Sequence, residues 1–485
     1  MAPRKVIIDT DPGVDDVVAM LLAFSALPEE LEVLLLSVTY GNIDVQNCLR
    51  NVVSLFFHVE KEIEWRKSRG KPLGFDGLRK QKPLVAIGPE HPLADQLLMA
   101  DFFHGTDGLG GIHQTHPHFT PAETWLQLFT QAGSSQSPAD RIISTELQKT
   151  NAMFTPSQAP ADEEILRLLR ENEPDTITIV AIGPLTNLAL AAAKDTETFL
   201  RAKEIVVMGG AIYEHGNVGP LPFLPNRHAS MVSEPPFRLI EQAPGPIRDM
   251  LNLRNQITPC AEFNTFADSY AAARLYALTS PNPSSTMPPA PPAPAAPAGQ
   301  PEGQRPPPYL APYPENLSRR LKVTLFPLDI TEQHILSRGT FRKFIEPQVA
   351  AGSPLADWAA AFLTSTFRKV ESLQENLSGD AVGLQLHDPL TIWYCMATTL
   401  TAWQISENED LRVETSGQWT RGMYVIDRRT RKKLEEGDAE ADSDHGKWLS
   451  VKSGNRLNRC TGSPQTAGQQ PFGEFLLQRI FGIET

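Results

Sequence analysis

The sequence contains little cysteine, no long apolar run and few basic residues. Four cysteines occur in 485 residues, far apart and without CxxC spacing, so we expect neither a zinc site nor a disulfide framework, in keeping with a reducing cytosol. No stretch of 18 apolar residues occurs, and the chain runs directly into the strand-like Val6–Ile8. We therefore expect a cytoplasmic protein with no signal peptide and no membrane partner. The net charge of −13 argues against nucleic acid as a partner.

Glycine is outnumbered by proline, 32 residues to 42, the reverse of average usage. Fourteen of the prolines lie between Pro281 and Pro314. This tract predicts a disordered, polyproline-rich surface loop. The remaining sequence has enough apolar residues for a large core.

Short runs rich in valine and isoleucine recur, each followed by turn residues and then by a helical pattern. This alternation predicts an α/β fold, a single large domain over residues 1–485 with a mostly parallel central sheet flanked by helices. Its active site is expected at the carboxyl ends of the strands. The expected strands are Val6–Ile8, Leu31–Tyr40, Leu84–Gly88, Thr176–Gly183, Glu204–Gly209 and Lys322–Leu328. The expected helices are Asp15–Ala26, Glu163–Glu171, Thr186–Ala193 and Phe472–Ile480.

Four stretches interrupt the alternation of expected strands and helices and are expected to be inserts. They are the polar residues 131–162, the proline-containing residues 219–257, the tract 281–314 and the charged residues 428–445. In the last, a basic run meets an acidic run, which predicts a solvated, hairpin-like loop. Residues from about 400 onward are expected to complete the domain with strands at Val413–Val425 and Trp448–Val451.

Candidate functional residues are most concentrated where the first strand ends, at Asp9-Thr10-Asp11-Pro12-Gly13-Val14-Asp15-Asp16. Four carboxylates in eight residues would repel one another in a cleft unless a cation compensates them. A helix cap needs only one of them. Oxygen ligands without a nearby Cys or His pair favour Ca²⁺ or Mg²⁺ over zinc.

An Asp-x-Asp at the end of a first strand also occurs in haloacid-dehalogenase-like phosphatases, in which Asp9 would be the nucleophile. The longer string instead resembles the inosine/uridine-preferring nucleoside hydrolase family, and the extra stretches look like those of fungal members. A phosphatase would leave Asp15-Asp16 and His387-Asp388 unexplained. Further segments agree in order: Tyr40-Gly41-Asn42, His104-Gly105-Thr106-Asp107-Gly108-Leu109-Gly110-Gly111, Ala181-Ile182-Gly183-Pro184-Leu185-Thr186-Asn187, Met208-Gly209-Gly210 with Gly216-Asn217, Ala261-Glu262-Phe263-Asn264 and His387-Asp388-Pro389-Leu390.

The resemblance implies one Ca²⁺ deep in the cleft and hydrolysis of the N-glycosidic bond of a small-molecule nucleoside. The implied metal ligands are Asp11, Asp16, the backbone carbonyl of Ile182, and Asp388. Asp11 would also be the general base for a water molecule on the metal. The implied ribose-binding residues are Asp15, Asn42, Asn217, Glu262, Asn264 and Asp388.

The resemblance also gives roles to residues near the base. His387 would protonate or hydrogen-bond the departing base. His104 would either line the base pocket or orient the glycine-rich loop, and Phe263 and Met208 match positions facing the substrate. Relatives are usually dimers or tetramers, so a homodimer or homotetramer is expected.

The sequence departs from the family between Asn217 and Glu262, where 44 residues replace a handful. Both residues are implied to touch the same ribose. We therefore hypothesise that residues 219–257 are an unspliced intron translated in frame, or a gene-model error. If the stretch is real, a second function arises: a catalytically impaired, calcium-dependent nucleoside- or ribose-binding protein.

Overall fold

A computed structural model describes most of the chain: residues 2–94, 97–121, 128–129, 153–216, 259–288, 312–373, 377–397, 401–429, 431–434, 443–465 and 471–483. The insert at residues 219–257 lies outside these ranges, as do residues 131–152 of the first insert and most of the proline tract. Asn217 lies outside them as well.

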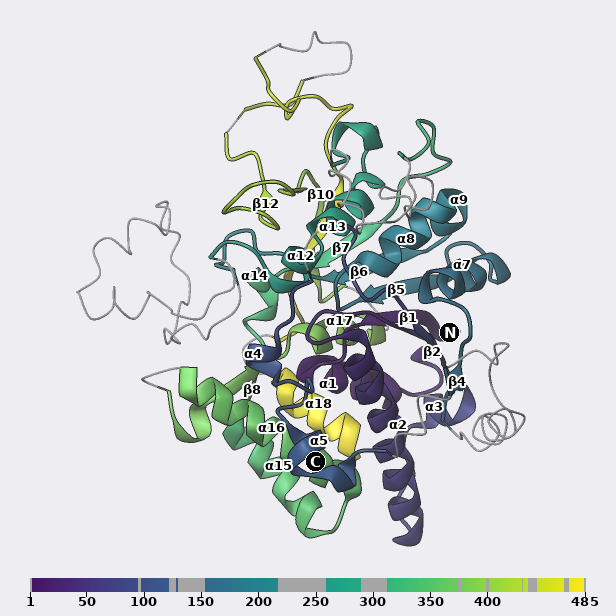
Figure 1. The fold of residues 1–485 in the computed structure, drawn as a ribbon, viewed down its shortest axis with the longest axis vertical. Helices are drawn as coiled ribbons and strands as arrows, with labels where there is room; N and C mark the ends of the chain where they lie inside the picture. Colours follow the sequence, from purple (N-terminus) through teal and green to yellow (C-terminus); the bar gives the residue numbers. More distant parts are fainter. Residues whose placement is uncertain are drawn as a thin grey trace, which may run out of the picture.

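A nine-stranded sheet forms the centre of the described structure (Figure 1). Its order is β10-β13-β7-β6-β5-β1-β2-β3-β4, and every neighbouring pair is parallel except β10 with β13. The mostly parallel sheet predicted from the sequence is therefore confirmed. The strands are β1 Arg4–Thr10, β2 Leu31–Val38, β3 Leu84–Ile87, β4 Thr155–Pro156, β5 Ile177–Ala181, β6 Glu204–Met208, β7 Val323–Phe326, β10 Gln404–Glu409 and β13 Leu457–Gly462.

Helices cover both faces of this sheet, because successive side chains of a strand point to opposite faces. In β1, Val6 and Ile8 belong to one apolar cluster and Ile7 to the other, and all three are fully buried. The longer helices are α1 Val14–Phe24, α2 Val45–Ser68, α7 Ala161–Glu171, α8 Thr186–Lys194, α13 Ser269–Ala277, α15 Arg338–Ala350, α16 Pro354–Leu373, α17 His387–Met396 and α18 Phe472–Phe481. The shorter ones are α3 Asp76–Lys80, α4 Asp101–His104, α5 Ile112–Thr115, α9 Thr196–Phe199, α12 Phe263–Ala267 and α14 Leu328–Thr331.

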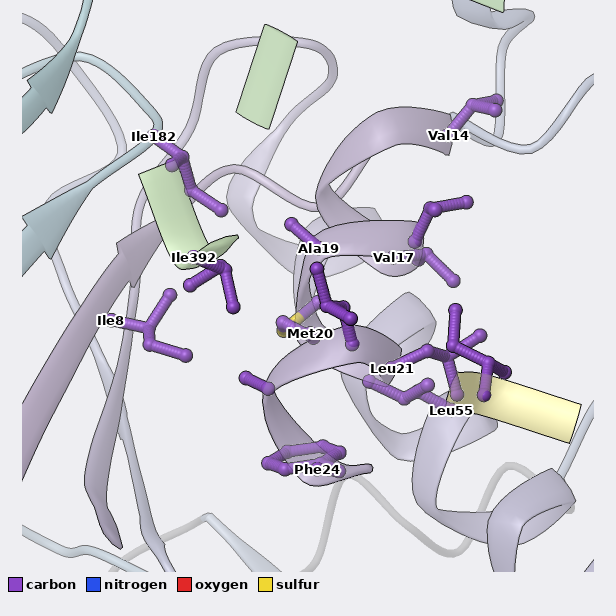
Figure 2. Close-up of a cluster of buried hydrophobic side chains, with 14 of the residues drawn as sticks. Ile8, Val14, Val17, Ala19, Met20, Leu21, Phe24, Leu55, Ile182 and Ile392 are labelled. Carbon is purple, nitrogen blue, oxygen red and sulfur yellow. The ribbon is translucent and has the colours of Figure 1, made fainter. Parts of the chain in front are cut away.

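The two helical layers are built from different parts of the chain. Helices α7, α8 and α13 pack on the sheet face to which Ile7 belongs. Helices α1, α2 and α16 to α18 pack on the opposite face, to which Ile8 belongs (Figure 1). Figure 2 shows Ile8 of β1 near Met20 of α1 and Ile392 of α17. This packing fixes the N-terminal ends of α1 and α17, which carry the acidic residues of the site.

The C-terminal region differs from the prediction. Only the ends of the expected strand Val413–Val425 are extended, as β11 Arg412–Val413 and β12 Tyr424–Val425, an antiparallel pair. Between them the chain turns, and Gly422 has a φ of +78° that a strand does not allow. The strand expected at Trp448–Val451 is a turn, in which Asp444 accepts a hydrogen bond from the Leu449 N–H at 2.7 Å.

Parts of two expected inserts, 131–162 and 428–445, lie among the described residues. Strand β4 lies within 131–162 and pairs with β3, so this part of the stretch belongs to the sheet. In the charged stretch, Arg429 forms ion pairs with Asp427 and Asp444 at 2.8 and 3.1 Å. A small antiparallel pair, β8 Ile335–Ser337 with β9 Gly383–Gln385, precedes α17. None of the helices in the described ranges combines the length and apolar character needed to cross a bilayer.

Candidate active site

The carboxyl ends of β1, β2 and β5 meet at one edge of the sheet, and the loops that follow them are in close contact. A Cβ added to Gly41, after β2, would lie 2.0 Å from Asp11 Oδ2. A Cβ added to Gly183, after β5, would lie 2.7 Å from Asp11 Oδ1. Both glycines therefore give the carboxylate of Asp11 the space that it occupies, which explains why they stand in the motifs.

Asp16 holds the loop between β1 and α1 in shape. Its Oδ1 accepts a hydrogen bond from Thr10 Oγ1 at 2.7 Å, and its Oδ2 accepts one from the Gly13 N–H at 3.0 Å. The side-chain amide of Asn42 donates to the same Oδ2 at 2.9 Å. Asp16 thus accepts a hydrogen bond from a backbone N–H group at the start of α1, where the helix dipole also favours a negative charge.

Asp11 is fully buried and only half of its carboxylate is satisfied. Oδ2 accepts the Asn42 N–H at 2.7 Å. Oδ1 has no hydrogen-bond partner within the described part of the chain. A buried carboxylate oxygen without a donor costs free energy unless a cation or another ligand contacts it. Oδ1 of Asp11 is therefore available to contact a cation or another ligand.

Three other carboxylates converge beside it. Asp15, Asp16 and Asp388 each place one oxygen so that the three lie within 4.8 Å of one another. Asp388 comes from the first turn of α17, which packs on α1. The structure thus brings together residues 372 positions apart, as the sequence prediction of one acidic site requires.

Burial and mutual repulsion oppose ionisation of this cluster. Burial, and then the charges of Asp15 and Asp16, hold the pKa of Asp388 well above its usual range. Burial and the charge of Asp16 raise the pKa of Asp15 to about 7, and the pKa of Asp11 rises well above its usual value for the same reasons. A divalent cation would reverse this repulsion. The all-oxygen donor set, together with the unsatisfied Oδ1 of Asp11, fits a hard cation.

The backbone carbonyl of Ile182, the fourth implied metal ligand, lies directly after β5. It accepts a hydrogen bond from Asn264 Nδ2 at 3.0 Å. A carbonyl oxygen has a second lone pair, so this bond leaves a ligand role open. The roles of Asp11, Asp16, Ile182 and Asp388 as metal ligands stay predictions.

Glu262 and Asn264 form a second wall of the site at the start of α12. Oε1 of Glu262 accepts the Asn264 N–H at 2.6 Å, and Oε2 accepts the N–H groups of Thr265 and Gly210, both at 3.0 Å. Glu262 is 1% exposed, and burial raises its pKa even though these donors favour the charged form. The charge of Glu262 also contributes to the raised pKa of Asp388.

Two histidines lie near this cluster and are neutral at neutral pH. Burial lowers the pKa of His387 to about 4. Burial, and then the charge of His387, lower the pKa of His104 to about 3. His104 Nδ1 lies 3.4 Å from the Val14 N–H at the start of α1, and His387 Nδ1 lies 2.8 Å from Thr331 Oγ1. The predicted roles of His387 and His104 stay predictions.

Of the remaining predicted site residues, Phe263 packs with Ala100 and Ala267 in a small apolar cluster. Ala100 precedes α4, which ends at His104, so Phe263 connects the second wall of the site with the segment that carries His104. Asn42 contacts Asp16 and Asp11 through its amide and its backbone. Asn217 lies outside the described residues, and its predicted role is not addressed by the structure.

Sequence reasoning missed several supporting residues. Asn51 donates to the carbonyls of Pro12 and Asp107 at 2.8 and 2.9 Å, joining the acidic loop to the glycine-rich loop. Asn51 has no signal in the sequence because it is one of several polar residues in α2, such as Asn47 and Ser54. His113 contacts Asn51 Oδ1 at 2.8 Å, and thereby supports the loop.

Asp9 lies beneath the site and does not face it. Its Oδ1 accepts hydrogen bonds from Ser37 Oγ at 2.5 Å and Asn187 Nδ2 at 2.8 Å. It is fully buried, and burial raises its pKa to about 7. A nucleophile must reach the substrate, so this placement argues against a phosphatase in which Asp9 attacks phosphorus.

Comparisons with known proteins agree with this geometry. Residues 6–290 and 311–449 match the family described as inosine-uridine preferring nucleoside hydrolase. Uridine nucleosidase 1 of Arabidopsis thaliana is 35% identical over 218 residues, which cover 45% of this chain and 48% of that protein. The chain therefore spans about half the length of that relative. A pyrimidine-specific ribonucleoside hydrolase of Klebsiella pneumoniae is 25% identical over 424 residues, 87% of each chain.

The fold is shared with solved structures as well. A plant nucleoside hydrolase superposes with a TM-score of 0.53 over 99% of this chain and 100% of its own, at 20% identity. This likeness supports the arrangement of strands and helices.

Proposed function

Because the chain belongs to the inosine-uridine preferring nucleoside hydrolase family, we propose that it hydrolyses the N-glycosidic bond of ribonucleosides to a free base and ribose. The observation that carries the proposal is the convergence of Asp11, with its unsatisfied Oδ1, and the carboxylates of Asp15, Asp16 and Asp388 at the carboxyl edge of the sheet.

We propose Ca²⁺ as the metal, held by Asp11, Asp16, the Ile182 carbonyl and Asp388. When bound, Ca²⁺ would lower the pKa of a water molecule and neutralise the repulsion among the carboxylates. Asp11 is the general base. Its Oδ2 is engaged by the Asn42 N–H, whereas Oδ1 is free within the described residues to take the proton of the attacking water. Gly41 and Gly183 leave room for this carboxylate, because a Cβ at either position would collide with it.

The ribose would lie between the acidic cluster and the start of α12. Asp15, Asn42, Asn217, Glu262, Asn264 and Asp388 are the proposed ribose-binding residues. Their acceptors and amides suit a polyol, whose hydroxyl groups must all be paired when they are buried. Cleavage passes through a ribosyl cation-like transition state. The negative side chains of this wall would stabilise the developing positive charge.

His387 would assist the departing base. The hydroxyl of Thr331 lies 2.8 Å from its Nδ1; if this hydroxyl donates, Nδ1 is the acceptor and the ring hydrogen is on Nε2. Since burial keeps the imidazole neutral, His387 would donate a hydrogen bond from Nε2 to the base. His104, packed against the start of α1, would complete the base pocket.

The relatives' names point to the substrates to try first. Uridine and inosine represent the pyrimidine and purine classes, and the similar Klebsiella protein is named for pyrimidine ribonucleosides. The cytoplasmic compartment and a homodimer or homotetramer belong to the same proposal and are supported by family membership alone.

The test is a chromatographic assay of purified protein with uridine and with inosine. The proposal expects uracil or hypoxanthine together with an equal amount of ribose. Bound nucleoside with no free base would instead support the binding-protein alternative. Release of phosphate from uridine monophosphate, without base release, would support a phosphatase.

A further inference from the structure

The C-terminal hairpin formed by β11, β12 and the turn between them packs directly on the segment that begins α12. Arg421 lies over the ring of Phe266, with its guanidinium carbon 4.2 Å from the ring centroid. Cys260 Sγ lies 3.4 Å from the carbonyl oxygen of Trp419. A Cβ on Gly422 would lie 2.9 Å from Phe266 Cα. The wall formed by Glu262 and Asn264, the proposed ribose wall, therefore lies next to this hairpin, which packs where Glu262 caps α12.

From this hairpin, the buried Tyr424 reaches toward Glu262 through a row of hydroxyl groups. Tyr424 Oη lies 2.6 Å from Tyr276 Oη and 3.3 Å from Thr265 Oγ1. Thr265 Oγ1 in turn donates to Glu262 Oε2 at 3.0 Å. A hydroxyl has one hydrogen. Thr265 Oγ1 therefore shares its hydrogen between Glu262 Oε2 and Tyr424 Oη, and the contact with Tyr424 fixes the place of its oxygen beside the carboxylate.

The ring of Tyr424 supports the same oxygen by a second route. Gly210 has a φ of +86°, and a Cβ at this position would lie 2.1 Å from Tyr424 Cε2. The aromatic ring thus packs against the backbone of Gly210, whose N–H donates to Glu262 Oε2 at 3.0 Å. Both the hydroxyl and the ring of Tyr424 act on groups that bind this carboxylate oxygen.

We propose that Tyr424 is a positioning residue that orients Glu262 toward a ribose hydroxyl through Thr265 and Gly210. The inference rests on the proposed function, and it assigns the C-terminal region a part in the reaction. Tyr424 does not touch the substrate. It fixes Oε2 of Glu262, so that Oε1 is presented to the ribose in one orientation.

Tyr424→Phe tests this, because it removes the hydroxyl and keeps the ring against Gly210. The substrates are uridine and its 2′-deoxy, 3′-deoxy and 5′-deoxy analogues. We expect kcat/KM for uridine to fall about tenfold. For the one analogue that lacks the hydroxyl held by Glu262, the variant and the wild type should differ much less. If Tyr424 only stabilises the fold, the variant should lose the same factor in kcat/KM on every substrate.

Tyr394→Phe is the matched control, since it removes a buried tyrosine hydroxyl that donates to Glu204 at 3.3 Å, at the opposite end of β6. It should leave the pattern across the analogues unchanged. An equal loss on all four substrates, or no loss relative to Tyr394→Phe, overturns the inference. If Tyr424→Phe does not fold, Tyr276→Phe is measured in its place. We expect it to lower kcat/KM with the same dependence on the substrate hydroxyl groups, by a smaller factor. An equal loss of kcat/KM on all four substrates in Tyr276→Phe overturns the inference as well. A wild type that releases no base from uridine contradicts the proposed function instead.

Discussion

The backbone N–H of Gly216 donates to the carbonyl of Pro259 at 3.2 Å. Forty-two residues separate them in the sequence, yet the two ends of that stretch meet. Three residues later, Glu262 caps α12 and contacts Gly210. Contacts among described residues therefore join the ribose wall to the segment that follows β6.

Deleting residues 219–257 should consequently leave the fold and the site in place, because Gly216 and Pro259, close to the two ends of the deletion, already lie within hydrogen-bond distance of each other. We expect a melting temperature equal to or above that of the full chain, and base release from uridine at least as fast. The check is thermal unfolding together with the nucleoside assay. Loss of folding or of turnover would show that the stretch is needed. Sequencing the transcript across codons 210–265 addresses its origin, and a mature message that contains it would refute the intron hypothesis.

Asp11→Asn should abolish turnover while the fold is retained. The substitution removes the base at the unsatisfied Oδ1, and loss of a general base typically costs about a hundredfold or more in kcat. Without metal, stability should not fall, since one of the mutually repelling carboxylates becomes neutral. Reducing-sugar release and thermal unfolding are measured on the same samples. Asp175→Asn, an exposed carboxylate paired with Arg319, is the control and should keep full activity; activity near that of the wild type in folded Asp11→Asn would refute the assignment.

Calcium affinity should weaken as the pH falls. Protons compete with the cation for carboxylates, and the pKa values of the proposed ligands Asp11 and Asp388 are raised well above their usual range. Ca²⁺ must displace the protons that these carboxylates bind, so affinity should fall about tenfold for each pH unit and each proton released. Isothermal titration at about pH 5.5 and about pH 7.5 in buffers of different ionisation enthalpy measures both quantities. Equal affinity at the two pH values, with no proton release, would contradict a metal site built on these carboxylates.

Thr331→Val should slow cleavage in a way that depends on the leaving group. The valine cannot hold Nδ1 of His387, so the hydrogen on Nε2 is no longer fixed toward the base. We expect kcat for uridine to fall about tenfold. A riboside of p-nitrophenol, which leaves without a proton, should lose little. Thr366→Val removes a buried hydroxyl bonded within its own helix and serves as control; the same loss on both substrates would rule out this role for Thr331.

The sequence predicted those parts of the molecule that depend on local pattern. Val6–Ile8 and the acidic motif after it lie within β1 and at its end, because a buried run and its turn residues are adjacent in the chain. The C-terminal region was beyond such reasoning. Pairing of β13 with β7 depends on packing across more than 130 residues, and β propensity follows that context. Tyr424 likewise carries no local sign that it lies against Gly210.

The most direct test of the account is the initial rate of ribose release from uridine and inosine, measured before chelation, after chelation and after Ca²⁺ is restored. The account predicts release from at least one of the two nucleosides, loss of that release with chelator and recovery with Ca²⁺. Release that continues unchanged in the chelated protein would contradict the metal-dependent mechanism. No release from either nucleoside by the calcium-loaded protein would contradict the proposed hydrolysis itself.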